Sequence, residues 1–112
     1  MSVSYFVRYE AVAENPSEFL RYYREQHTSI LARFPGLRRI VLHAPVAWND
    51  RFPVRPDRFL LLAQMEFDTQ EDLDRALGSE ARADARRDFA NFPRFEGSVY
   101  HQATRSEEVF PA

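Results

Sequence analysis

The order of strand-like and helix-like patterns along this chain limits its fold more than any other feature. Four segments, residues 4–10, 37–44, 58–67 and 98–105, are rich in β-branched and aromatic side chains, as strands are. A stretch with helical periodicity lies between the first and second of these segments, and another lies between the third and fourth. The order strand, helix, strand, strand, helix, strand predicts an α+β fold of the ferredoxin-like βαββαβ type. We therefore expect one four-stranded antiparallel sheet with both helices on one face.

The first helix carries clear signals at both ends. Asn15 supplies an N-cap, Pro16 favours the first helical position, and Glu18 follows three residues after the cap. Pro35 and Gly36 end the helix, because proline cannot continue it and glycine permits the reversal. Between these ends, apolar and aromatic side chains recur at three- and four-residue spacing. The resulting stripe contains Phe19, Tyr22, Tyr23, His27, Ile30, Leu31 and Phe34.

The second helical region begins in residues 68–72, which supply an N-cap and acidic side chains for the first helical turn. Gly78 and Ser79 interrupt it, so we expect one broken helix or two short ones. Its buried side is predicted to carry Ala81, Ala85, Phe89 and Phe92. Its charged residues alternate in sign, as on a solvated helix face: Arg75, Arg82, Arg86 and Arg87 lie among Glu71, Asp74, Glu80, Asp84 and Asp88.

At 112 residues the chain has room for one domain. We expect it to span residues 1–105, followed by a tail, 106–112, that crosses to a neighbour or frays. Residues 45–57 contain three prolines and no helical period, which predicts a long loop. Such a loop is either a lid or binding loop, or an ordinary surface excursion.

A sheet with helices on one side leaves its other face bare. The run 59–63 is apolar at every position and so predicts a strand that is covered on both faces. A second copy of the chain, stacked sheet against sheet, would cover the bare face. We therefore expect a homodimer of the dimeric α/β-barrel kind.

The composition excludes several function classes. The net charge is −2 with interspersed signs, which predicts no nucleic-acid partner. All 15 basic residues are Arg and there is no Cys, so lysine Schiff bases and cysteine nucleophiles are excluded. No apolar run reaches the roughly 18 residues of a membrane span, and no signal-peptide pattern is present. We expect a cytoplasmic protein with no membrane contact.

Two stretches together resemble a known family. Residues 22–40, YYREQHTSILARFPGLRRI, join an aromatic pair, His27 and a Pro-Gly-Leu-Arg turn. Residues 59–92, FLLLAQMEFDTQEDLDRALGSEARADARRDFANF, join a strand, an acidic helix start and a Ser-containing break. This pattern resembles the EthD-like family of the dimeric α/β-barrel superfamily from Tyr5 to about Thr104.

The resemblance implies the ferredoxin-like fold, the dimer, and a pocket between the first helix and the sheet. It also implies that the connection after the second strand caps this pocket. Members and relatives include proteins linked to ether degradation, lactone isomerases, polyketide cyclases and dehydratases, cofactor-independent oxygenases and, in neighbouring branches, haem-handling enzymes. The family name therefore does not supply a reaction.

His27 is the first candidate catalytic residue. It lies four residues after Tyr23 and three before Ile30, which places the imidazole on the stripe facing the sheet. A histidine there can move a proton in either direction near neutral pH, and the resemblance points to the same position. The alternative is a structural histidine bonded to a backbone carbonyl. Tyr23 is the second candidate, as a residue that orients the imidazole or a substrate oxygen, the alternative being a core tyrosine.

Candidate substrate-binding residues lie on the strands and the loop. Arg8 interrupts an apolar strand and is suited to hold an anionic oxygen, unless it pairs with Glu10 or Glu66. Trp48, in the loop, is suited to fold over a flat ligand, unless it packs on a dimer partner.

The remaining histidines, His43 and His101, are further candidate substrate-binding residues and belong to the second and fourth predicted strands. Alternation does not reveal which sheet face lines the pocket. The three histidines are far apart in sequence and no carboxylate completes a metal-ligand spacing, so we predict no metal.

These residues predict a cofactor-free enzyme that acts by proton transfer on a small cyclic or aromatic oxygenated metabolite. Isomerisation, cyclisation and dehydration are the reaction types that this chemistry allows. The alternatives are a non-catalytic binding module for a hydrophobic ligand or haem, a cofactor-independent oxygenase, and a dimer with a mainly structural role.

Overall fold

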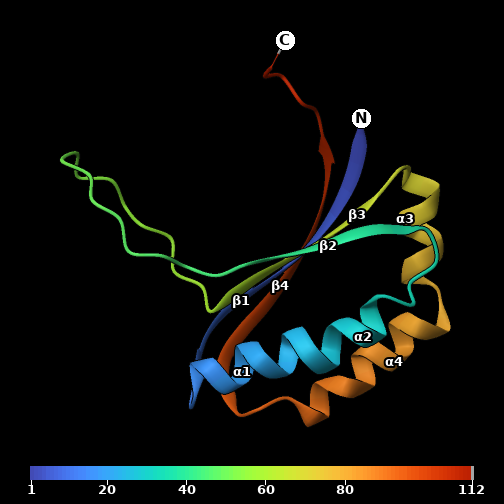
Figure 1. Cartoon of the computed structure of the whole chain (residues 1–112), viewed down its shortest axis with the longest axis horizontal. Coiled ribbons are helices and arrows are strands. Elements are labelled where there is room, and N and C mark those ends of the chain that lie inside the picture. Colours follow the sequence, from blue (N-terminus) through green and yellow to red (C-terminus); the bar gives the residue numbers. More distant parts are fainter. Residues whose placement is uncertain (112) are drawn as a thin grey trace.

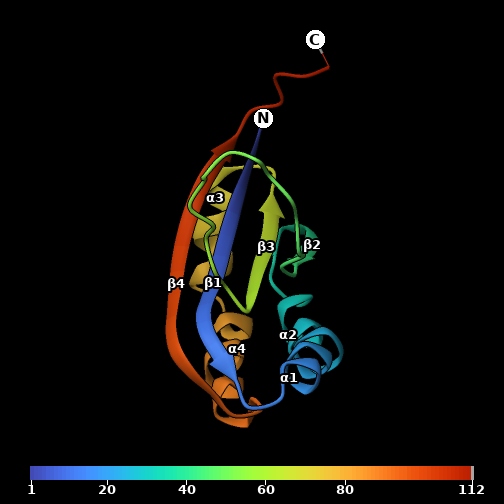
Figure 2. The same cartoon turned by 90° about the vertical axis from the view of Figure 1, so that its left-hand side faces the viewer.

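The computed structural model describes residues 1–111, so the last residue of the expected tail lies outside the described residues. Its four strands form one antiparallel sheet in the order β2-β3-β1-β4, which Figure 2 shows side by side. Their bounds are β1 (Ser2–Ala13), β2 (Leu37–His43), β3 (Leu61–Phe67) and β4 (Phe95–Ser106). This strand order and the alternation of helices and strands confirm the predicted ferredoxin-like α+β fold.

The helical segments cover one face of this sheet (Figure 1). The first runs through α1 (Pro16–Tyr22), the π-helical turn η1 (Tyr23–His27) and α2 (Thr28–Leu31). The second comprises α3 (Gln70–Leu77), α4 (Glu80–Asp88) and the short 3-10 turn η2 (Phe89–Asn91). Among residues 1–111, no helix combines the length and apolar character needed to cross a membrane.

The start of the first helix is as predicted. The Asn15 side chain accepts a hydrogen bond from the Glu18 backbone N–H at 3.1 Å, and Pro16 occupies the first turn. The helix ends at Leu31, before Pro35, and Gly36 makes the turn into β2 with φ of +76°. That left-handed conformation is easily adopted only by glycine.

The second helix starts within the predicted stretch 68–72. Thr69 is the N-cap, because its hydroxyl accepts the Asp72 backbone N–H at 3.1 Å. Asp68 lies outside the helix and pairs with Arg38 at the surface. The predicted break is confirmed, since Ser79 caps a separate helix, α4.

The first and fourth strands are longer and the third strand is shorter than the sequence predicts. β1 and β4 pair without a break from Ser2 with Ser106 to Ala13 with Phe95. β3 begins at Leu61, so residues 44–60 form one connection. This connection, which we call the arm, projects away from both the sheet and the helices (Figure 1).

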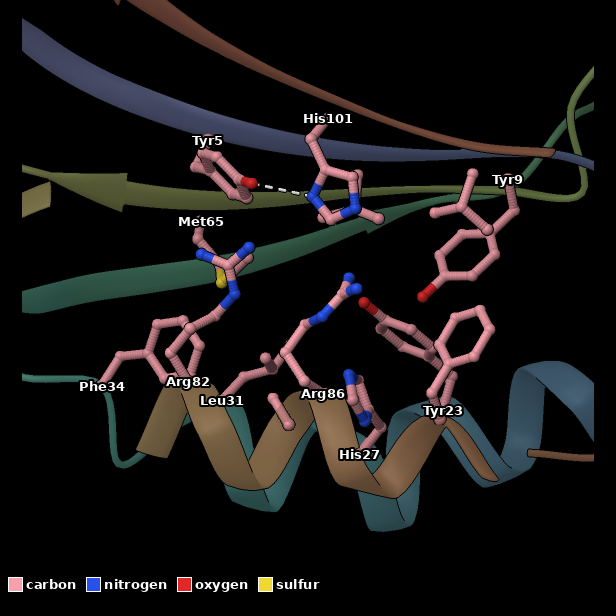
Figure 3. A pocket seen from close by; sticks show the side chains of 14 residues that line it. Tyr5, Tyr9, Tyr23, His27, Leu31, Phe34, Met65, Arg82, Arg86 and His101 are labelled. Atoms are coloured by element: carbon pink, nitrogen blue, oxygen red, sulfur yellow. Dashed lines mark hydrogen bonds between the residues drawn. The ribbon is translucent and has the colours of Figure 1, made fainter. Parts of the chain in front are cut away.

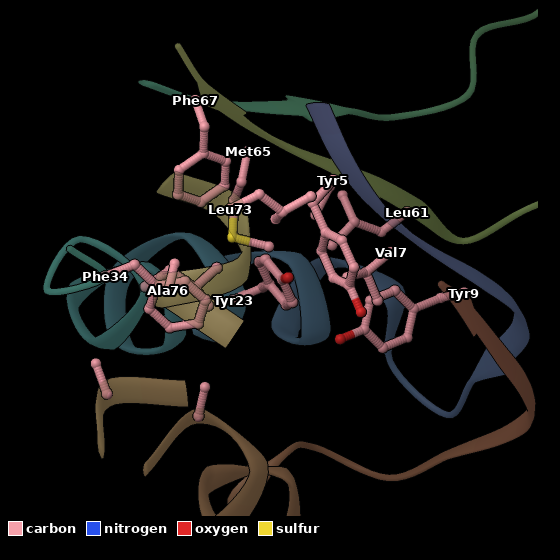
Figure 4. Close-up of a cluster of buried hydrophobic side chains, with 14 of the residues drawn as sticks. Tyr5, Val7, Tyr9, Tyr23, Phe34, Leu61, Met65, Phe67, Leu73 and Ala76 are labelled. Carbon is pink, nitrogen blue, oxygen red and sulfur yellow. The ribbon is translucent and has the colours of Figure 1, made fainter. Parts of the chain in front are cut away.

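The core lies between the sheet and the helices. β1 contributes Tyr5, Val7 and Tyr9 to it, and β3 contributes alternate side chains from Leu61 to Phe67 (Figure 4). The helices add further buried residues, which are Phe19, Tyr23, Leu31, Leu73, Ala76, Ala81 and Ala85. The period of two along the strands therefore directs one apolar row toward the helices.

The opposite face of the sheet is more polar than we expected. Phe59 and Leu60 precede β3, so within the run 59–63 only Leu62 projects from this face. Its neighbours across the sheet are mostly polar or charged, and include Ser4, Arg8, His43, Gln64, Glu66 and Gln102. The expected apolar bare face is therefore present only in part: Leu62 shares this face with Phe6, Val41 and Tyr100, but two of the five residues of the run lie outside the strand.

Candidate functional site

A cavity of about 50 Å³ lies between the helices and the sheet. Its walls come from β1, β3 and β4, from the first helical segment and from α4 (Figure 3). This is the position that the family resemblance implies. The arm, residues 44–60, contributes no side chain to the wall and does not cap the cavity, because it projects away from the body of the domain.

His27 is bonded to a carboxylate inside this site. Its Nδ1 atom lies 2.9 Å from Oδ2 of Asp88, the last residue of α4. The imidazole is 5% exposed and Asp88 is 9% exposed. A carboxylate can only accept, so Nδ1 carries the hydrogen and Nε2 keeps its lone pair. Figure 3 shows the second ring nitrogen of His27 directed into the space between helices and sheet.

Asp88 is held by two further donors. The Tyr22 hydroxyl donates to its Oδ1 atom at 2.8 Å, and the Asn91 side-chain amide donates to the same atom at 3.1 Å. Burial, and then the hydrogen bond to Asp88, raise the pKa of Tyr22 to about 12, so the phenol stays protonated as a donor. Each carboxylate oxygen therefore has at least one fixed partner.

The charge states follow from these contacts. Burial lowers the pKa of His27 below its ordinary value, and the Asp88 carboxylate offsets only part of that effect. Desolvation alone would raise the pKa of Asp88, but the hydrogen bonds from His27, Asn91 and Tyr22 outweigh it and lower that pKa. Near neutral pH the pair is a neutral imidazole beside a carboxylate. This arrangement allows Nε2 to accept a proton while Asp88 stabilises the resulting imidazolium.

The imidazole of His27 is packed between two aromatic rings. Tyr23 and His27 are the first and last residues of the π-helical turn η1. Their ring centroids lie 4.8 Å apart, and Phe92 closes the other side at 4.7 Å. These two aromatic contacts hold the imidazole of His27 in place and leave its Nε2 atom free of a hydrogen bond to any described residue.

Tyr23 lines the same cavity and is 1% exposed. Burial, with the neighbouring Tyr9 hydroxyl, raises the pKa of Tyr23 well above its usual range. It therefore stays protonated near neutral pH, as a hydrogen-bond donor. Tyr23 packs on His27, whereas the hydrogen-bond partner of the imidazole is Asp88.

His101 also lies in the cavity wall, on β4. Its Nδ1 atom is 2.7 Å from the Tyr5 hydroxyl on the neighbouring strand. Burial lowers the pKa of His101, and the positive charges of Arg82 and Arg86 lower it further. The structure thus brings His27, Tyr23 and His101 together around one cavity.

The other sequence candidates lie elsewhere. Arg8 projects from the opposite sheet face, where its guanidinium pairs with Glu10 at 3.1 Å and Asp57 at 3.6 Å. The contacts of Arg8 therefore match the alternative in which this arginine forms an ion pair on its own sheet face. His43 is on that face too, with Nε2 2.9 Å from Oε1 of Gln64.

Trp48 lies on the arm and is 56% exposed, so it does not contact the cavity wall. Within residues 1–111, no three His, Asp or Glu side chains gather closely enough to hold a metal ion. His27 lies on the helix-covered side of the sheet and His43 lies on the other side, so the two do not share a site within one chain.

Three residues of the cavity wall or of the His27–Asp88 pair were not predicted as site residues. Asp88, Arg82 and Arg86 were all assigned to the solvated face of a charged helix. A usable signal existed for the arginines, since each lies one position after a buried alanine, Ala81 or Ala85. No local signal identifies Asp88, because its partner lies 61 residues away.

Comparison with known proteins places this geometry in a family. Residues 13–95 match the family model of the EthD domain. The structure is similar to that of an EthD family protein from Bacillus halodurans C-125, with 20% identity and a TM-score of 0.72 over 96% of this chain and 100% of that one.

Two further solved structures share the fold. SnoaB, a cofactor-independent oxygenase from Streptomyces nogalater, has 16% identity and a TM-score of 0.63 over 99% of this chain and 98% of its own. A dimeric protein of unknown function from Bacteroides fragilis has 15% identity and a TM-score of 0.59 over 94% and 96% of the two chains. No curated protein matches the chain. Because the family model spans most of its length, this chain belongs to the EthD domain family.

Proposed function

We propose that the chain is a cofactor-free enzyme that transfers a proton on a small cyclic or aromatic oxygenated metabolite. The observation that supports it is the His27–Asp88 pair, which leaves one imidazole nitrogen free beside a cavity lined by aromatic side chains. The partner of this histidine is a buried carboxylate that two further donors, Tyr22 and Asn91, hold in place. The pair therefore favours a base over a packing residue.

The proposed reaction begins with His27. Its Nε2 atom removes a proton from the carbon next to a carbonyl group, and the electron pair moves to the carbonyl oxygen as an enolate. Asp88 stabilises the imidazolium, and the Tyr23 hydroxyl donates to the developing oxyanion. The imidazolium then returns the proton to another atom of the substrate, which gives isomerisation, or to a departing hydroxyl, which gives dehydration.

A cofactor-independent oxygenase is the second candidate. SnoaB, whose fold this chain shares along nearly its whole length, is described as such an enzyme. The same proton abstraction would generate an electron-rich substrate anion, with dioxygen as the co-reactant. Oxygen consumption separates the two reactions, because only the oxygenase uses dioxygen.

The proposed enzyme is a homodimer. The uncovered sheet face and the projecting arm, with Trp48 and Phe52 exposed, are surfaces that a second copy would cover, and the Bacteroides fragilis protein of the same fold is dimeric. We assign Arg8, His43 and Trp48 to this interface rather than to the substrate. Native mass spectrometry should give twice the chain mass of 13.2 kDa; a 13.2 kDa species at micromolar concentration contradicts the dimer.

The function is tested by hydrogen exchange in D2O. Proton NMR would follow loss of the α-protons of a panel of bicyclic aryl ketones and lactones with the wild type, His27→Gln and Asp84→Asn. The wild type should accelerate exchange for at least one compound, and His27→Gln should lose about a hundredfold or more of that rate. Asp84→Asn, a surface change on the same helix as Asp88, should retain it. Equal rates for the wild type and His27→Gln, or no acceleration across the panel, contradict the proposal.

A further inference from the structure

Two arginines on α4 face the cavity without a carboxylate partner. Arg82 and Arg86 both line it, and Figure 3 shows both side chains reaching from the helix toward the sheet. In the described part of the chain, no acidic side chain lies within 4 Å of either guanidinium, whereas Arg87 on the same helix pairs with Asp84.

The helix itself offers them no counter-charge. On a helix surface, residues three and four positions apart are neighbours. For Arg82 and Arg86 none of these positions is acidic; they are Gly78, Ser79, Ala83, Ala85, Phe89 and Ala90, and the two arginines themselves. Arg75 and Arg87 each have an aspartate three residues earlier and pair with it. Arg82, which is half-buried, and Arg86, which is exposed, therefore have no acidic neighbour on the helix.

The other titratable groups at the cavity do not neutralise this charge. Asp88 is already bonded to His27, Tyr22 and Asn91. The pKa of His101 is lowered by burial and then by the two arginines, so this histidine is neutral near pH 7. Tyr5 lies under the Arg82 guanidinium, with 5.6 Å from its carbon to the ring centroid, and Tyr9 and Tyr23 are protonated phenols with raised pKa values. The cavity therefore has an excess of positive charge.

The rest of the wall is apolar. Leu31, Met65 and Val99 line it, and Phe89, which is 40% exposed, lies at its edge on the surface. A ligand that fits both parts of this wall has a flat apolar body and one anionic group. Guanidinium groups suit a carboxylate in particular, because their planar donor pairs match its two oxygens.

We propose that Arg82 and Arg86 form an anion-binding subsite and that the substrate is a cyclic or aromatic carboxylic acid. This inference rests on the proposed function, since it specifies the substrate class of the same cavity. The arginines bind the carboxylate and the apolar wall holds the ring. His27 acts on another part of the same molecule.

The test compares benzoate with benzamide, its neutral isostere, by NMR titration of the amide signals of the protein. The wild type should bind benzoate at least about tenfold more tightly than benzamide, as charge-assisted hydrogen bonds to guanidinium predict. Arg82→Gln and Arg86→Gln should each reduce this preference, and the double variant should abolish it. Arg87→Gln, which removes the same charge from the outer face of α4, should keep it.

Thermal unfolding shows whether the variants fold. Removal of one of two mutually repelling charges should leave the melting temperature equal or raise it. The proposal is overturned if the wild type shows no preference for benzoate, or if the double variant, folded, keeps the preference. His27→Gln separates the two proposals: it should keep the benzoate preference while it loses the α-proton exchange, so each result can fail without the other.

Discussion

The Nδ1 atom of His27 lies 2.9 Å from Oδ2 of Asp88, although 61 residues separate the two in sequence. This contact joins the π-helical turn of the first helical segment to the end of α4. It fixes which imidazole nitrogen carries the hydrogen, and it links the two helices that cover the sheet. The same hydrogen bond therefore contributes to both the stability of the fold and the chemistry of the cavity.

Asp88→Asn should destabilise the protein by about 2 kcal/mol or more. An amide has one acceptor oxygen in place of two, and its NH2 group would face a donor of His27, Tyr22 or Asn91. Urea unfolding measures the effect. Asp84→Asn is the control, since that residue makes only exposed ion pairs with Arg33 and Arg87 and its loss should matter far less. Equal changes in the unfolding free energy of both variants contradict the prediction.

The unfolding free energy should fall as pH drops from 7 toward 5. The pKa values of His27 and His101 are lowered in the folded state, so the unfolded chain binds more protons below an ordinary histidine pKa of about 6.5. Stability is therefore fully present above that pH and is lost as pH falls toward the folded-state pKa values. A second loss, from Asp88, follows near and below pH 4, because its folded-state pKa is also lowered.

Urea midpoints at several pH values between 7.5 and 4.5 measure the first loss. His27→Gln should flatten the dependence between pH 7 and 5, and His101→Gln should flatten it further. A stability that rises on acidification through this range would show that the imidazoles are charged in the folded protein.

Tyr23 should tolerate loss of its hydroxyl better than loss of its ring. Tyr23→Phe keeps the packing against His27 and Tyr9 and should change stability by about 1 kcal/mol or less. Tyr23→Ala empties a site that is 1% exposed and should reduce it by about 3–5 kcal/mol. If Tyr23→Phe nevertheless slows α-proton exchange severalfold, the hydroxyl assists the reaction; an unchanged exchange rate leaves Tyr23 with a packing role only.

Gly97→Ala should weaken the pairing of β1 with β4 near the cavity. Gly97 has φ of +142°, and a Cβ atom there would lie 2.4 Å from the Glu10 carbonyl oxygen. Relief of that overlap should cost about 2 kcal/mol or more, measured by urea unfolding. Gly78→Ala is the matched control, because its Cβ would meet no atom closer than 3.6 Å. An unchanged unfolding free energy for Gly97→Ala would show that β1 and β4 can move apart there without loss of stability.

Local signals in the sequence predicted most of the fold. The Asn15 cap, the Gly36 turn and the break at Gly78 and Ser79 each depend on residues within a few positions of one another, and each lies where it was predicted. The N-cap Thr69 lies within the predicted stretch 68–72. The start of the third strand was predicted too early, because the apolar run 59–63 does not show that β3 begins only at Leu61.

The site was predicted only in part, for a physical reason. Helical spacing placed His27 and Tyr23 on the side that faces the sheet, and both line the cavity. Asp88, Arg82 and Arg86 were missed because tertiary packing, and not local spacing, decides which charges of α4 turn inward. Arg8, in contrast, was predicted to bind substrate but does not line the cavity. Val7 and Tyr9 on either side of it are buried toward the helices, so strand alternation directs Arg8 to the other face of the sheet.

The protonation state of His27 is the most direct test of a neutral base held by Asp88. Nitrogen-15 NMR of the imidazole at pH 7 distinguishes a protonated Nδ1 from a protonated Nε2 and gives the pKa on titration. We predict a neutral ring with hydrogen on Nδ1 and a lone pair on Nε2, with a pKa below the ordinary histidine value. A ring that is cationic at pH 7, or neutral with hydrogen on Nε2, would contradict the account.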